Sequence, residues 1–132
     1  MFTNGSMTIF NKHTTSNKDV YYIPHNIENV FWDSIEEVSE RNGADKNDEV
    51  VVYIPFDKND FSKYVNPKQY DSFLEDKWTI REGDFIVKGD ISNIGNVDTI
   101  KELKDYEVFT IYFYDINDFG SSNMQHIKVK GK

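Results

Sequence analysis

The residue types best suited to chemistry in this chain are its three histidines and its 23 carboxylates. Such side chains bind metal ions or transfer protons when several of them converge. His13, His25 and His126 are isolated, and none belongs to a His-x-x-x-His or Glu-x-x-His pattern. The chain contains no cysteine. The sequence therefore predicts no zinc site, and it excludes disulfides and thiolate metal sites.

Two short acidic segments, Asp45–Glu49 and Asp57–Asp60, have the composition of calcium-binding loops. An EF-hand loop needs glycine at its sixth position and glutamate at its twelfth, and neither segment has them. The chain also lacks the phosphate-binding motif Gly-x-x-x-x-Gly-Lys-Ser/Thr and the nucleophile motif Gly-x-Ser-x-Gly. We therefore expect no catalytic residue, no cofactor and no bound metal, and we expect that the protein is not an enzyme.

The first candidate interaction site is the strongly charged stretch between residues 34 and 48. We expect it to protrude as a solvated loop or hairpin, although a short helix over residues 34–40 is an alternative. Protruding from the domain, this loop would be free to contact a partner in an assembly. Its candidate residues are Glu36, Glu37, Glu40, Asp45 and Asp48.

The second candidate interaction site is the last strand of the chain. There, Ile127 and Val129 alternate with His126, Lys128 and Lys130, so the polar residues share one face. The lysines form a short basic segment on an acidic chain, which suits pairing with the acidic surface of a neighbouring copy. Alternatively, they are solvated charges that keep a strand edge from aggregating.

Composition indicates which elements must position these residues. Twenty residues are Phe, Tyr or Trp, whereas alanine occurs once and leucine twice. Strands favour aromatic and β-branched residues, and helices favour alanine and leucine. Trp32, Trp78 and the tyrosines would either fill a core or form a stacking platform for carbohydrate, and we favour the core. The chain is therefore predicted to be all-β or β-dominated.

Apolar runs separated by turn residues predict the individual elements. The residues from 78 to 80 and from 85 to 89 are expected to form a hairpin, as are the two C-terminal runs. Asn66 and Pro67 suit the start of a short helix, and a further helical turn is expected at 98–103. Strands are expected at 7–12 and 19–24, joined as a hairpin, and at 50–56, 78–80, 85–89, 106–114 and within 119–130, while residues 27–35 form a further apolar patch. These elements predict one domain over residues 1–132, a small barrel or sandwich of roughly six to eight short antiparallel strands with one or two short helices and a long polar loop.

Charge narrows the range of partners. The formal net charge is −8, which disfavours binding to nucleic acid or to an anionic membrane, since both attract clustered lysine and arginine. An acidic surface can nevertheless line a channel through which DNA slides without sticking. The N-terminal residues do not resemble a secretory signal, and no segment approaches the ~20 apolar residues of a membrane span. The lack of cysteines slightly favours an intracellular origin.

Three segments carry a family resemblance: Phe2–Lys12, Gly83–Gly89 and Phe119–Val129. They resemble small virion proteins of tailed bacteriophages and of prophages of Gram-positive bacteria, which are encoded among the head–tail connection genes. The resemblance implies a stopper or head-completion protein of the virion neck, made in the cytoplasm of the host bacterium. Tail-terminator and minor capsid roles are alternatives in the same gene neighbourhood.

The resemblance also implies a set of partners. Neck proteins of this kind form rings, six- or twelve-fold, between the portal-bound adaptor and the tail-terminator or tail proteins. They close or line the DNA channel, with DNA only as passing cargo and without cofactors or membrane contact. The rival function, from another class, is a monomeric acidic β module that binds carbohydrate or a host protein.

Overall fold

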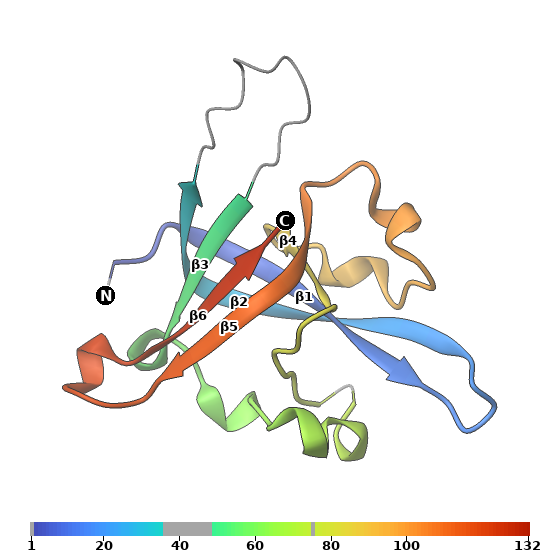
Figure 1. The fold of residues 1–132 in the computed structure, drawn as a ribbon, viewed down its shortest axis with the longest axis horizontal. Coiled ribbons are helices and arrows are strands. Elements are labelled where there is room, and N and C mark those ends of the chain that lie inside the picture. The colour runs from blue at the N-terminus through green and yellow to red at the C-terminus, as the bar shows by residue number, and fades with distance from the viewer. Residues whose placement is uncertain (1, 36–48, 75) are drawn as a thin grey trace.

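A computed structural model describes residues 2–35, 49–74 and 76–132 of the chain. These residues form a closed barrel with the strand order β1-β2-β3-β6-β5-β4, and all neighbouring strands are antiparallel (Figure 1). The predicted β-dominated fold with a small antiparallel barrel is thus confirmed. The strands are β1 (Gly5–Thr14), β2 (Val20–Ile35), β3 (Glu49–Pro55), β4 (Phe85–Lys88), β5 (Val108–Asn117) and β6 (His126–Gly131).

The barrel interior is filled by alternate residues of each strand. On β3 these are Val50, Val52 and Ile54, and on β6 they are Ile127 and Val129. The inward side chains of Ile54, Ile127 and Val129 are fully buried. Each buried aliphatic side chain of this size stabilises the fold by roughly 1.5–3 kcal/mol relative to an exposed one. The period of two in the sequence therefore reports the inner and outer faces of β3 and β6 correctly.

A second, smaller core lies on the outer face of β1 and β4. Phe10, Phe85 and Val87 point away from the barrel interior, because the intervening Ile9 and Ile86 belong to the main core. The segment after β4 covers them with further apolar side chains, Val97 and Leu103. This segment contains two 3-10 helices, η5 (Ser92–Ile94) and η6 (Ile100–Leu103).

Both predicted helical segments are present, and both are 3-10 helices. The first is η4 (Pro67–Ser72), where the Asn66 side chain accepts a hydrogen bond from the N–H of Lys68. The second is η6, which Thr99 and Glu102 close with a capping box. Further 3-10 turns are η2 (Phe56–Lys58), η3 (Phe61–Lys63) and η7 (Ser122–Met124). None of the described helices is long and apolar enough to cross a membrane.

The structure differs from the sequence-based expectation in one strand pairing and in one strand boundary. Residues 78–80 do not form a hairpin with β4, because Trp78 makes a parallel bridge to Tyr64 while β4 pairs with β1 and β5. The predicted strand over 19–24 and the separate apolar patch over 27–35 belong to the single strand β2, which pairs first with β1 and then with β3. Residues 20–30 of β2 pair with β1 and residues 31–35 pair with β3, and the strand continues without a break between these two parts.

The side chains of β5 do not alternate regularly between the two faces. Strict alternation would place Phe109, Ile111 and Phe113 on one face, but the register with β6 shifts between Ile111 and Phe113. This irregularity in the strand reverses the side-chain orientation. Ile111 is buried in the core, whereas Phe113 is 41% exposed and pairs with Lys130 on the outside. Tyr114 packs against the core instead.

Candidate interaction surfaces

The predicted acidic loop falls between β2 and β3. All of its candidate residues lie outside the described residues, so their contacts stay a prediction. They are Glu36, Glu37, Glu40, Asp45 and Asp48.

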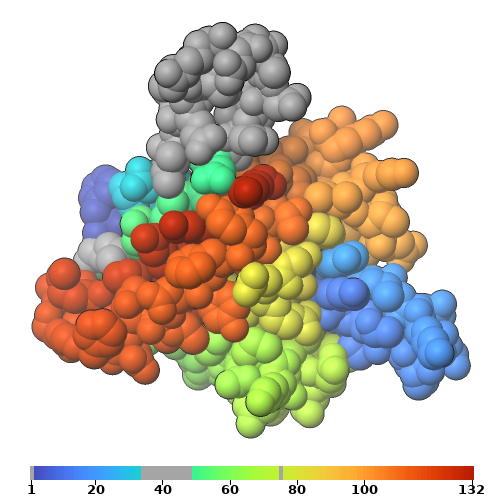
Figure 2. Space-filling view, viewed as in Figure 1, coloured from blue at the N-terminus to red at the C-terminus, as the bar shows by residue number. Residues whose placement is uncertain are grey.

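The predicted polar face of β6 is present on the outside of the barrel. Ile127 and Val129 are fully buried, and His126, Lys128 and Lys130 are each partly exposed on the opposite face. Their predicted role in protein contacts is not tested by this arrangement. In Figure 2, β5 and β6, coloured orange to red, occupy much of the near surface of the molecule.

An aromatic row extends from this face across β3 and β2. The rings of His126 and Tyr53 lie 5.4 Å apart between centroids, Tyr53 and Phe31 lie 6.1 Å apart, and Phe31 and Phe2 lie 5.8 Å apart. Phe2, at the end of the row, is 73% exposed. Large exposed aromatic side chains are typical of protein contact surfaces.

On its other side, β6 is flanked by the outward residues of β5. The Nζ atom of Lys130 lies 5.2 Å from the centre of the Phe113 ring, in a cation–π contact. Lys128 stands opposite Asp115 in the strand register. We name these outward residues of the two strands the β5–β6 face. They are Phe113, Asp115, Asn117, His126, Lys128 and Lys130.

The hydrogen bonds of His126 determine its tautomer. Its Nδ1 atom lies 2.8 Å from the carbonyl oxygen of Met124, so Nδ1 carries the proton and donates it. Its Nε2 atom then accepts a hydrogen bond from Nδ2 of Asn117 at 3.1 Å. The imidazole is thereby fixed in orientation and meets the Tyr53 ring edge-on, at an interplanar angle of 69°.

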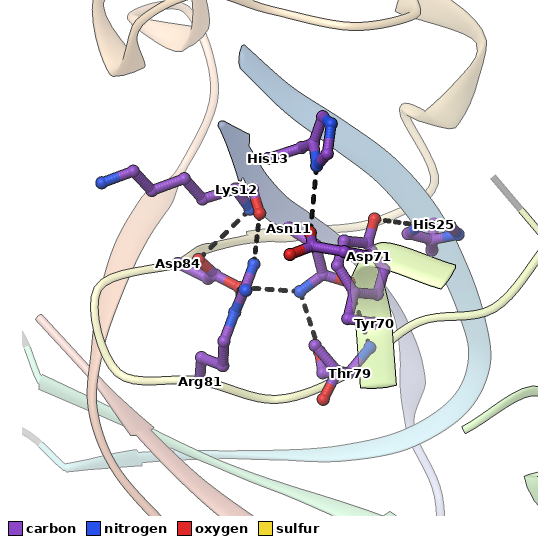
Figure 3. A network of polar contacts seen from close by, with 9 residues as sticks. All are labelled: Asn11, Lys12, His13, His25, Tyr70, Asp71, Thr79, Arg81 and Asp84. Carbon is purple, nitrogen blue, oxygen red and sulfur yellow. Dashed lines mark hydrogen bonds and ion pairs between the residues drawn. The ribbon is translucent and has the colours of Figure 1, made fainter. Parts of the chain in front are cut away.

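A cluster of polar side chains that the sequence did not reveal lies where residues 79–84 meet β1 (Figure 3). Nδ2 of Asn11 donates to the carbonyl oxygen of Thr79 and to Oδ2 of Asp84, both at 2.8 Å. Nε of Arg81 lies 3.1 Å from the same carboxylate oxygen, and the N–H of Lys12 donates to Oδ1 at 3.3 Å. Arg81 also donates to the carbonyl oxygen of Lys12.

This cluster is a structural clamp. Asn11 is fully buried and Asp84 is 2% exposed. Burial raises the pKa of Asp84, while Arg81 and the hydrogen bonds from Asn11 and Lys12 act in the opposite direction. Because both carboxylate oxygens already accept hydrogen bonds, the clamp holds residues 79–84 on β1. The pair Arg81 and Asp84, three residues apart in the sequence, was the local signal that was missed.

The histidines of β1 and β2 do not converge either. His25 Nε2 lies 3.1 Å from the hydroxyl of Tyr70, and burial lowers the pKa of His25 to about 4. His13 Nδ1 lies 3.0 Å from a carboxylate oxygen of Asp71. Across the residues that the structure describes, no three His, Cys, Asp or Glu side chains are grouped so that they could hold a metal ion. Trp32 and Trp78, the predicted alternatives for a sugar platform, are both buried in the core.

Comparison with known proteins gives one match. Residues 2–132 match the model of a family of unknown function, DUF6751, so the chain belongs to that family. No curated protein and no solved structure matches the chain significantly.

Proposed function

We propose that this member of the DUF6751 family is a structural protein of the head–tail interface of a tailed bacteriophage, most specifically a stopper or head-completion subunit. In this role, copies of the barrel assemble into a six- or twelve-fold ring between the portal adaptor and the tail, in the neck of the virion. The protein is made in the cytoplasm of the host bacterium. Tail-terminator and minor capsid proteins are the alternatives from the same gene neighbourhood.

The observation that carries the proposal is the β5–β6 face. It presents lysines and an exposed phenylalanine on the outside of a chain whose net charge is −8. A basic and aromatic surface on an acidic protein is complementary to the remainder of another copy, and such complementarity selects both partner and orientation. A contact between two different surfaces of identical subunits is heterologous, and it generates a ring when the rotation closes.

The charge of the chain supports the second part of the role, which is to surround passing DNA. Protein binds DNA mainly by neutralising phosphates with lysine and arginine. This chain has 15 such residues against 23 carboxylates, so DNA passing through a ring of it would not be held. The resemblance of residues 2–12, 83–89 and 119–129 to small virion proteins supports the same setting.

The proposal is tested by the particle mass of the purified protein. Light scattering over a concentration series would be measured for the protein alone and for its mixture with the portal–adaptor complex of the same phage. A mass of six or twelve subunits, alone or on that complex, is the expected result. The proposal would be contradicted if the protein is a monomer at every concentration and does not bind the portal–adaptor complex. A glycan-binding screen would then test the rival function of a carbohydrate-binding module.

A further inference from the structure

Over half a dozen residues, one edge of β2 has no strand beside it among the residues that the structure describes. From Val20 to Val30 this strand pairs with β1, and only from Phe31 onward does it pair with β3. The edge that faces away from β1 is therefore not covered by any described strand before Phe31. An unpaired strand edge presents a row of backbone N–H and C=O groups that can bind another chain.

Contacts at its two ends define this free edge. At one end, the backbone of Tyr22 exchanges two hydrogen bonds with Val97, at 2.7 and 3.0 Å. At the other, the Asn59 side chain substitutes for a strand, since its Nδ2 donates to the carbonyl oxygen of Asn29 at 2.8 Å. Backbone groups alternate along an antiparallel strand, so those of Pro24 and Asn26 point the same way as those of Tyr22. No other described residue forms a hydrogen bond with this outward edge of Asn26.

The free edge lines a groove. Six consecutive residues, Pro24–Asn29, form one wall of a hollow of about 540 Å³, which is within the range of about 300–1,000 Å³ found for binding sites. The opposite wall comes from the segment after β3, drawn in green in Figure 1, and from Trp78. Oδ1 of Asn26, also in this wall, is buried and has no hydrogen-bond partner among the described residues. The remaining lining residues are Lys58, Asn59, Asp60, Lys63, Asp76 and Ser92.

The shape of the groove selects its occupant. The residues around Lys58 and Asp60 form the wall opposite this edge, so they stand between it and the edge of a second barrel. A single extended chain can enter, and its backbone offers the donors and acceptors that the outward groups of Asn26 lack. Carboxylates of Glu28, Asp60 and Asp76 outnumber the two ammonium groups of the lining. Together with the net charge of −8, they favour a chain that carries a positive charge.

We propose that this groove binds an extended peptide segment with a cationic side chain, which adds as a strand to β2 between Pro24 and Glu28, next to the position that Asn59 covers at Asn29. The main-chain hydrogen bonds to Asn26 supply affinity, and the carboxylates of Glu28 and Asp76 select the basic side chain. This inference does not depend on the ring proposed above, because the groove lies on β2 and the β5–β6 face lies on other strands.

The test is selection from a library of random dodecapeptides on the immobilised full-length protein. Enriched peptides should be basic. They should bind the variant Asn26→Pro, which lacks the outward N–H, more weakly than the unaltered protein. The best synthetic peptide should slow hydrogen exchange of the Asn26 amide at least about tenfold, as expected for a newly formed backbone hydrogen bond. Nuclear magnetic resonance would follow this amide and the chemical shifts of residues 24–29.

Two controls keep the test decisive. If Asn26→Pro does not fold, the same peptide with N-methyl groups on alternate amides replaces it, and this peptide should not bind. Neutralising the groove with Glu28→Gln and Asp76→Asn should weaken binding about threefold to tenfold, whereas the exposed control pair Asp105→Asn and Asp118→Asn should not. The proposal is overturned if no peptide is enriched, or if the enriched peptides leave exchange of the Asn26 amide unchanged.

Discussion

At the scale of single residues, Asp84 shows how a carboxylate can serve the fold alone. Its side chain is almost completely buried. Its two carboxylate oxygens accept hydrogen bonds from Asn11 Nδ2, Arg81 Nε and the N–H of Lys12. The negative charge is therefore matched by its surroundings, and an uncharged amide in its place would direct an N–H₂ group at one of these donors.

We predict that Asp84→Asn lowers the free energy of unfolding by about 2–3 kcal/mol, because hydrogen bonds to a charged group are lost and a buried donor is left without an acceptor. Urea unfolding followed by tryptophan fluorescence measures this change. The exposed variant Asp105→Asn is the matched control and should change the free energy by less than about 0.5 kcal/mol. Equal stability of the two variants would show that Asp84 is not part of a clamp.

The burial of His25 makes the stability of the fold depend on pH. Burial lowers its pKa to about 4 in the folded protein, against 6.5 for the free side chain. Between these values the unfolded chain binds a proton that the folded chain does not, so stability falls as the pH decreases from 6.5 to 4. His25→Gln removes this titration, and its urea midpoint should depend less on pH over that range. A midpoint that falls in parallel for both proteins would contradict the assignment.

How much of this the sequence could predict depends on the distance along the chain between contacting residues. The placement of Lys128 and Lys130 on the outer face followed from alternation with Ile127 and Val129, a purely local pattern. The contact of Asn11 with Asp84 joins residues 73 positions apart. A local pattern cannot report such a pair, so the clamp was missed.

At the scale of elements, the irregular register of β5 shows where local patterns fail even within one strand. Gly131 of β6 faces the part of β5 that precedes the shift. A Cβ atom at Gly131 would lie 2.9 Å from Cβ of Phe109 and 3.4 Å from the carbonyl oxygen of Thr110. Neither atom is at the end of a flexible side chain, so the two strands would have to separate.

We predict that Gly131→Ala destabilises the protein by about 1–3 kcal/mol, the usual cost of overpacking. Thermal unfolding monitored by circular dichroism measures it. Gly5→Ala is the matched control, since the nearest atom to its added Cβ, in Trp32, is 3.4 Å away. A Gly131→Ala variant as stable as Gly5→Ala would mean that β5 and β6 can separate without loss.

Strand positions were predictable from apolar alternation, but strand partners were not. Phe85–Lys88 was correctly predicted as a strand, yet its neighbours are β1 and β5 rather than the residues just before it. The assignment of Trp78 to a hairpin was wrong because its ring completes the core at the open end of the barrel, between Phe61 and Tyr64. Burial, not pairing, explains the apolar residues at 78–80.

At the scale of the whole molecule, closure of the barrel determines which surfaces are available to partners. A closed barrel has no free outer strands, so contacts with partners must use outward side chains or a partly covered edge. The β5–β6 face provides the first kind of surface and the groove beside β2 provides the second. In the proposed ring, the first would join neighbouring subunits, while the second would remain open to an extended chain.

The last prediction follows from the charge of that face. If Lys128 and Lys130 contact the acidic surface of a neighbouring subunit, Lys128→Glu with Lys130→Glu turns attraction into repulsion, and like charges across an interface cost several kcal/mol. The assembly mass in light scattering should then fall to that of a monomer. Lys101→Glu with Lys104→Glu changes the net charge equally at two exposed positions, one in η6 and one just after it, and should leave the mass unchanged.

The pair of variants separates a specific contact from a general effect of charge. If both double variants fail to assemble, added negative charge alone drives the subunits apart. If both still assemble, the β5–β6 face is not the contact that forms the ring. Salt provides an independent check, because exposed charges are screened over about 10 Å at 0.1 M. A charge-dependent ring should therefore weaken as salt is added, whereas the aromatic row from Phe2 to His126, if it carries the contact instead, should be insensitive to salt.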